Sequence, residues 1–214
     1  MIYDTYIICG YTVHIMSNED QPLKSNEDLN FTAEEQDKFQ EKEKLFHKIK
    51  EEIEKKITKE DIVSLVTKSG NTQEPERNYI SMVRYILDEM NLKYEKASSQ
   101  QSKDFRNVGD IHLDIEVKKT DSAVVIFNDT CPSKNIFYIV FCTTKTIKKY
   151  MPQILFVNGM EFLEGTEEWL PKYKEKIEEL KDEYGRGENK KKLAGIMEVY
   201  TRPNYKCNIS TFLK

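Results

Sequence analysis

The chain is poor in the residues that build the commonest metal centres. Its 214 residues include only four cysteines and three histidines. The cysteines lie far apart, at Cys9, Cys131, Cys142 and Cys207. Zinc sites cluster their ligands at short spacing, and small secreted scaffolds are dense in cysteine. The sequence therefore predicts reduced, buried thiols and disfavours both a zinc site and a disulfide framework.

Long apolar runs are also lacking. No segment approaches the roughly 18 to 20 apolar residues that a membrane-spanning helix needs. The opening MIYDTYIICGYTVHIM is apolar, but it has neither a basic leading region nor a small-residue cleavage site. We therefore expect no membrane association, a cytoplasmic location, and a strand or ordered tail at this end.

A strong excess of one charge is absent as well, since the formal net charge is −4. This value argues against non-specific adhesion of the whole surface to nucleic acid. The charge is uneven, however: residues 1–61 hold 15 acidic and 9 basic side chains, and the remainder holds 22 and 24. A polyanionic partner is therefore compatible with the C-terminal two thirds of the chain.

Helical spacing marks the first third of the sequence. The apolar positions of 31–57 step by sevens, threes and fours, at Phe39, Phe46, Ile49, Ile53 and Ile57. Thr58, with Asp61 three residues later, predicts a capping box that begins a second, short helix. The segment 71–91 predicts a third helix with Pro75 in its first turn.

The remaining segments alternate between strand and helix signals. Apolar, β-branched and aromatic runs bounded by turn residues predict strands at AVVIFN, NIFYIVFCTT, QILFVNG and LAGIMEVYTRP. Residues 171–184 predict a helix with Tyr173, Ile177, Leu180 and Tyr184 facing inward. We expect an α/β or α+β fold with a central mixed sheet flanked by helices. Residues 1–70 would form an N-terminal strand or tail with a helical extension, and residues 71–214 the core, within one compact domain.

The stretch SKDFRNVGDIHLDIEVKKTDS, residues 102–122, carries five acidic and four basic side chains in what otherwise reads as two strands. Because side chains alternate along a strand, Asp114, Glu116 and Lys118 share one face. The other face, with Leu113 and Ile115 among its residues, is apolar. One side of this strand is therefore predicted to be buried, and the other carries acids beside a lysine.

A second carboxylate near Glu116 could come from Asp110, from Asp104, or from Asp114, which is adjacent on the same face but belongs to the same strand. A hairpin centred near Asp110 would place Asp104 opposite Glu116 and Arg106 opposite Asp114, with an ion pair in the latter case. Asp110 itself is six residues from Glu116, roughly 20 Å along an extended strand. The register favours Asp104 over Asp110 as the partner of Glu116 and leaves Asp110 as the alternative.

An aspartate followed, through a hairpin, by Glu-x-Lys resembles the PD-(D/E)XK nuclease superfamily. The wider run SSQQSKDFRN…DIEVKKTDS…IFNDTCP resembles type II restriction endonucleases in particular, over roughly residues 74–142. Lys103 stands where the family often has proline. The resemblance implies a restriction-endonuclease-like core that hydrolyses phosphodiester bonds of double-stranded DNA at a short specific sequence. A palindromic site would imply a C2 homodimer.

The residue types fit this chemistry independently of the resemblance. Mg²⁺ takes one or two carboxylates together with waters and a substrate phosphate. The expected ligands are Asp104, Glu116 and the Val117 carbonyl, and Lys118 would orient the attacking water or stabilise the developing negative charge. Asp104, Glu116 and Lys118 are thus the candidate catalytic residues, with Mg²⁺ as the cofactor.

Polar and basic residues around these strands are candidates for DNA contacts, either to base edges or to phosphates. They are Gln100, Gln101, Arg106, Lys119, Asn128, Asp129 and Arg202. Two other functions remain open at this point. One is a junction-resolving or repair nuclease with the same core, and the other is a non-catalytic DNA-binding or helix-mediated interaction protein.

Overall fold

The computed structural model describes residues 3–8, 11–16, 33–66, 73–96, 103–128, 130–185 and 203–214. The chain divides into two compact units, Met1–Asn30 and Phe31–Lys214. In the first unit, β1 (Tyr3–Ile8) and β2 (Tyr11–Met16) pair as an antiparallel hairpin. The apolar opening segment therefore forms two strands.

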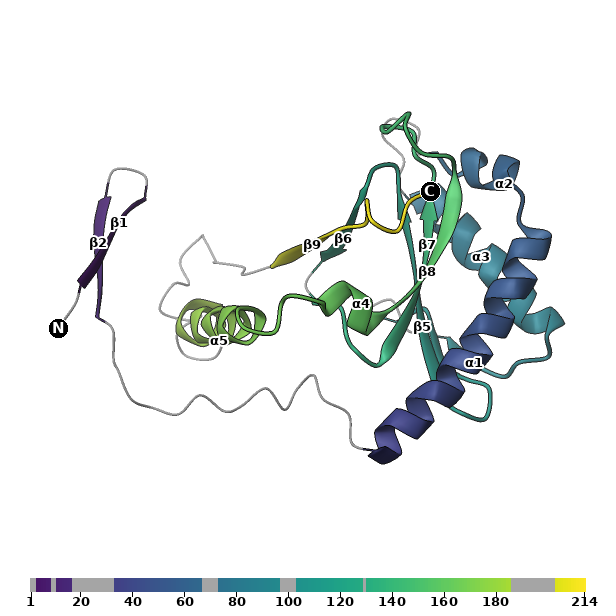
Figure 1. Ribbon diagram of the computed structural model, residues 1–214, viewed down its shortest axis with the longest axis horizontal. Helices are drawn as coiled ribbons and strands as arrows, with labels where there is room; N and C mark the ends of the chain where they lie inside the picture. The colour runs from purple at the N-terminus through teal and green to yellow at the C-terminus, as the bar shows by residue number, and fades with distance from the viewer. Residues whose placement is uncertain are drawn as a thin grey trace. The chain divides into compact units, whose positions relative to one another are not determined.

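The second unit is built on a five-stranded mixed sheet (Figure 1). Its strands, in spatial order, are β3 (Glu95–Lys96), β4 (Phe105–Val108), β5 (Leu113–Thr120), β7 (Ile136–Cys142) and β8 (Gln153–Asn158). Strands β5 and β7 are parallel and the other neighbours are antiparallel. With helices on the sheet, this arrangement confirms the expected α+β class with a central mixed sheet.

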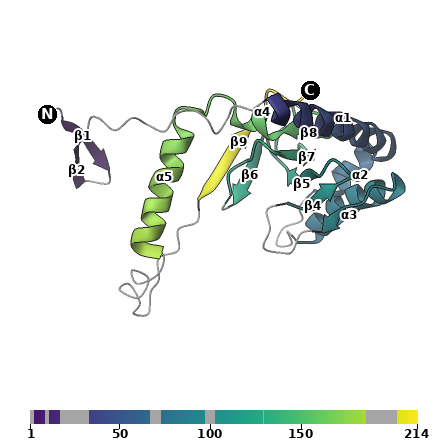
Figure 2. The ribbon, with the colours of Figure 1, turned by 90° about the horizontal axis from the view of Figure 1, so that it is seen from below.

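Three helices cover one face of the sheet (Figures 1 and 2): α1 (Ala33–Lys56), α2 (Lys59–Ser64) and α3 (Gln73–Glu89). The predicted capping box is present, because Thr58 and Asp61 exchange side-chain to backbone hydrogen bonds at the start of α2. Ile49 and Ile53 of α1 are fully buried in the same apolar cluster as Ile115 of β5. The helical segment before residue 70 therefore contributes directly to the core of the sheet domain.

The opposite face carries a smaller second layer. Strands β6 (Val124–Asn128) and β9 (Asn204–Asn208) pair antiparallel, and α4 (Gly159–Leu163) follows β8. Three rings, those of Phe127, Tyr138 and Phe162, meet edge to face with centroids 5.2 to 5.4 Å apart. This aromatic contact joins the second layer to the central sheet, because Tyr138 belongs to β7.

The last described helix, α5 (Leu170–Leu180), continues into a π-helical turn, Lys181–Gly185. Its position is as predicted, but its predicted inward face is wrong: Tyr173, Leu180 and Tyr184 are exposed. Apolar spacing identifies a helix face without identifying the surface that covers it. The predicted strand LAGIMEVYTRP lies, apart from its last proline, outside the described residues. Within the described part, no helix is long and apolar enough to cross a membrane.

Gly159, the first residue of α4, packs against the loop that precedes β7. A Cβ atom added to it would stand 1.7 Å from the carbonyl oxygen of Ser133. Since this neighbour is backbone, we expect Gly159→Ala to lower the free energy of unfolding by about 1–3 kcal/mol. Urea denaturation measures this loss, and an unchanged midpoint would show that α4 can move away from Ser133 at no cost.

Candidate functional site

The β4–β5 hairpin sets the positions of the charged side chains. Phe105 lies opposite Ile115, as the predicted register requires, and Val108 lies opposite Leu113 after a register shift. Asn107 has a φ of 51° inside this irregularity. Continuing the Phe105–Ile115 register places Asp104 next to Glu116, and the Asp104 amide donates to the Ile115 carbonyl over 3.1 Å.

The Asp104 carboxylate is fixed by the backbone of β5. Its Oδ2 accepts a hydrogen bond from the Val117 amide, with 2.7 Å between nitrogen and oxygen. The N–H and C=O of a strand residue leave the same edge of the strand, so the Val117 carbonyl lies on the Asp104 side of β5. The two predicted oxygen donors of Asp104 and Val117 therefore share one edge.

Glu116 and Lys118 project together from the face of β5 opposite the α1–α3 layer. The Lys118 Nζ lies 2.5 Å from Glu116 Oε1, and their side chains are 27% and 7% exposed. Burial raises the pKa of the Glu116 carboxyl; Lys118 opposes this shift and the nearby Asp104 adds to it. The Lys118 ammonium also lies over the ring of Phe127, 5.4 Å from its centroid. The structure thus brings Asp104, Glu116 and Lys118 together in a shielded corner.

The remaining acids of the hairpin take other roles. Asp114 pairs with Lys103, and its Oδ1 accepts from the Asn107 amide at 3.1 Å. The expected ion pair for Asp114 is thus made by Lys103, while Arg106 stands opposite Glu95 in the β3–β4 register. Asp110 lies exposed in the turn between β4 and β5. The geometry therefore favours Asp104 over Asp110 as the partner of Glu116.

The residues that were expected to contact DNA are only partly within the described part of the chain. Lys119 points to the opposite face from Lys118, is 9% exposed and pairs with Asp121 at 3.0 Å, so its ammonium is engaged within the fold. Asn128 is exposed at the end of β6, and Arg106 is half-buried on β4. The other four residues lie outside the described part of the chain: Gln100, Gln101, Asp129 and Arg202.

Two carboxylates and one carbonyl suit a hard divalent ion better than a soft one. Mg²⁺ binds through one or two carboxylates and keeps several waters, whereas zinc needs a fuller set of protein ligands. Among the described residues, no group of three or more His, Cys, Asp or Glu side chains is placed to hold a metal ion, so an ion here would rely on two carboxylates and on waters. The donors at this corner therefore fit Mg²⁺.

The sequence analysis did not single out Tyr138, which lies next to Glu116 in the β5–β7 register, because the run of residues around Tyr138 is uniformly apolar.

The raised pKa of Glu116 predicts a pH dependence of stability in the metal-free protein. The folded state retains this proton to a higher pH than the unfolded state does. The contribution of Glu116 to the free energy of unfolding therefore falls as pH rises through the raised pKa. We expect Glu116→Gln to remove this component. Urea midpoints measured in EDTA from about pH 4 to about pH 7 test this. The wild-type midpoint should lie below that of the variant near pH 7, and this gap should narrow as the pH falls. A gap that does not change with pH would contradict the prediction.

The corner therefore combines the carboxylates of Asp104 and Glu116 with the Val117 carbonyl and the Lys118 ammonium. No family model, curated protein or solved structure matches the chain.

Proposed function

We propose that this chain is a Mg²⁺-dependent endonuclease of the type II restriction class, cutting double-stranded DNA at a short specific sequence. One observation carries the proposal: the Asp104 carboxylate, held on the Val117 amide, lies beside the Glu116–Lys118 pair at the edge of β5. The sequence resemblance to PD-(D/E)XK nucleases supports the same assignment. A restriction-endonuclease-like core is part of the proposal.

Asp104, Glu116 and the Val117 carbonyl would hold the ion. When bound, Mg²⁺ polarises the scissile phosphate and acidifies a water. Asp104 is oriented before metal binding, because its Oδ2 is already anchored to β5. Glu116 must be ionised to act as a ligand, and the ammonium of Lys118 at 2.5 Å favours that form. With Glu116 as a ligand of the ion, Lys118 would stabilise the negative charge that develops on the phosphate.

A specific palindromic site would be read by a C2 homodimer, since the symmetry of the protein mirrors that of the DNA. We include this state in the proposal. Sedimentation of the full chain with and without cognate DNA tests it, and a strictly monomeric complex would rule the dimer out.

The enzymatic test is incubation of the purified chain with a large mixed-sequence DNA, with Mg²⁺ and with EDTA. We expect discrete bands that require Mg²⁺, are lost in Asp104→Ala and persist in Asp110→Ala. This matched pair separates the two candidate aspartates. Cleavage of branched DNA alone would favour a junction-resolving enzyme, and metal-independent binding without cleavage of any substrate would favour a non-catalytic binding protein.

A further inference from the structure

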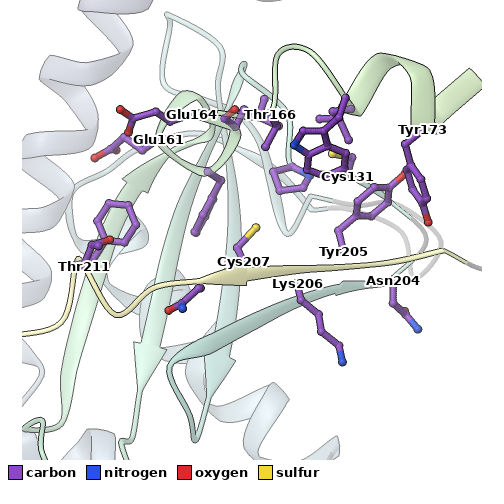
Figure 3. Close-up of a pocket in the computed structure, with 18 residues that line it drawn as sticks. Cys131, Glu161, Glu164, Thr166, Tyr173, Asn204, Tyr205, Lys206, Cys207 and Thr211 are labelled. Carbon is purple, nitrogen blue, oxygen red and sulfur yellow. Dashed lines mark hydrogen bonds between the residues drawn. The ribbon is translucent and has the colours of Figure 1, made fainter.

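A second site lies away from the Asp104–Glu116 corner. The α4–α5 connection, the loop after β6 and strand β9 enclose a cavity of about 530 Å³ (Figure 3). Ligand sites of small organic molecules span about 300–1,000 Å³ and combine apolar walls with a few polar groups. This cavity has both the size and the mixed lining of such a site.

One end of the cavity is aromatic. The ring centroids of Trp169 and Tyr173 lie 6.3 Å apart, and those of Tyr173 and Tyr205 lie 5.8 Å apart, both pairs edge to face. Trp169 is 52% exposed although its neighbour Leu170 is buried, so the helix start is anchored while the indole faces solvent. Exposed ring faces of this kind are stacking surfaces for planar ligands.

The middle of the cavity is uncharged. All residues of β9 line the cavity, but the side chains of Tyr205 and Cys207 point into it, whereas those of Asn204 and Lys206 leave the other face of the strand (Figure 3). Burial raises the pKa of the Cys207 thiol to about 11 and also raises that of Cys131, so both thiols are neutral at physiological pH. The walls therefore suit a neutral ring better than a free anion.

Carboxylates stand at the other end. Figure 3 shows Glu161 and Glu164 across the cavity from Tyr173 and Tyr205. Glu161 caps α4, since its Oε2 accepts from the Asn158 amide at 2.7 Å. Glu164 follows that helix and is exposed. A carboxylate at this end can accept hydrogen bonds from the amino groups of a planar ligand.

Two ring contacts connect the cavity to the proposed catalytic corner. The Lys118 ammonium lies 5.4 Å from the Phe127 ring centroid, and Phe127 lies 5.4 Å from Phe162, which lines the cavity. Lys118 and the cavity are thus linked through two rings, and a nucleotide whose phosphate lies at Lys118 would present its base to the cavity only after that base leaves the stack.

We infer that this cavity binds a nucleobase, stacked against the aromatic end of Trp169, Tyr173 and Tyr205, with its amino groups toward Glu164. The ligand class follows from the cavity alone. The source of the base, a nucleotide extruded from the DNA beside the cleaved phosphate, rests on the proposed nuclease function. A free nucleoside is the other source of the same chemistry.

Trp169 is the only tryptophan in the chain, so its fluorescence reports directly on this cavity. Titration of the full chain in EDTA with adenosine, cytidine or guanosine should quench Trp169 saturably, and thymidine, which lacks an exocyclic amino group, should bind more weakly. Tyr205→Ala should weaken nucleoside binding about tenfold or more. Tyr85→Ala, which removes an exposed tyrosine of α3, is the matched control and should change nothing.

A second arm uses duplex DNA that contains the fluorescent base 2-aminopurine near the cleavage site, bound to the Glu116→Ala protein. A rise in 2-aminopurine emission that is lost in the Tyr205→Ala, Glu116→Ala double variant identifies an extruded base; nucleoside quenching without this rise identifies a free nucleoside as the ligand. Quenching that is linear in nucleoside, or equal in Tyr205→Ala, Tyr173→Ala and wild type, would overturn the inference. The nucleoside titration needs neither metal nor cleavage, so its result can be interpreted even if the nuclease proposal fails.

Discussion

Glu116→Ala is expected to lower the rate of Mg²⁺-dependent DNA cleavage by at least about 10²–10³-fold, the loss that follows removal of one group stabilising a transition state. The physical reason is that Glu116 supplies one of the two carboxylates that the described residues bring to the corner. With Asp104 alone, the ion would be held mainly by water and would no longer be fixed relative to the phosphate. Cleavage rates under single-turnover conditions, at saturating DNA, measure this loss without interference from product release.

Lys118 provides the comparison that separates metal binding from charge stabilisation. Its ammonium pairs with Glu116 at 2.5 Å and is placed on the ring of Phe127. We expect Lys118→Ala to reduce cleavage while Mg²⁺ still binds, whereas Glu116→Ala should weaken Mg²⁺ binding itself. Isothermal titration with Mg²⁺ in the presence of DNA distinguishes the two. Wild-type cleavage by Glu116→Ala, or by Asp104→Ala, would remove the corner from consideration as the active site.

The sequence was most informative where interactions between residues close in the chain determine the structure. The Thr58–Asp61 spacing predicted the start of α2, because a capping box involves only four neighbouring residues. Alternation along β5 placed Ile115 in the core and Glu116 with Lys118 on the other face. The turn signal near Asp110 gave the correct pairing of Phe105 with Ile115.

The sequence was less informative where long-range packing decided. Beside the register shift between Phe105 and Val108, Asp114 pairs with Lys103 and accepts a hydrogen bond from the Asn107 amide. Residue propensities do not distinguish this arrangement from a regular hairpin. The apolar residues of α5 were expected to face a core, but Leu170, its first residue, is the only one of them that is buried. Likewise, no local pattern indicated that Trp169 and Tyr205 line one cavity, since they lie 36 positions apart in the chain.

The boundary between the helical segment and the sheet domain can be tested by stability. Ile53 of α1 has no exposed surface and packs in the cluster that includes Val83 of α3 and Ile115 of β5. We expect Ile53→Ala to lower the free energy of unfolding of the whole sheet domain by about 2–5 kcal/mol, because truncation loses apolar burial and leaves a cavity. Urea denaturation followed by far-ultraviolet circular dichroism measures this change in a single transition.

A detachable extension would behave differently. Were α1 an independent appendage, Ile53→Ala would melt one helix and leave the sheet transition at its original midpoint. Ile126→Ala on β6, where the side chain is 49% exposed, is the matched control and should stay within about 0.5 kcal/mol of wild type. Because Phe46 and Ile49 of α1 share the cluster with Ile53, a cooperative loss would also mean that the sheet bearing Asp104 and Glu116 depends on α1 for its stability. Variants that disturb α1 should then reduce cleavage through the folded fraction, with no change in the rate per folded molecule.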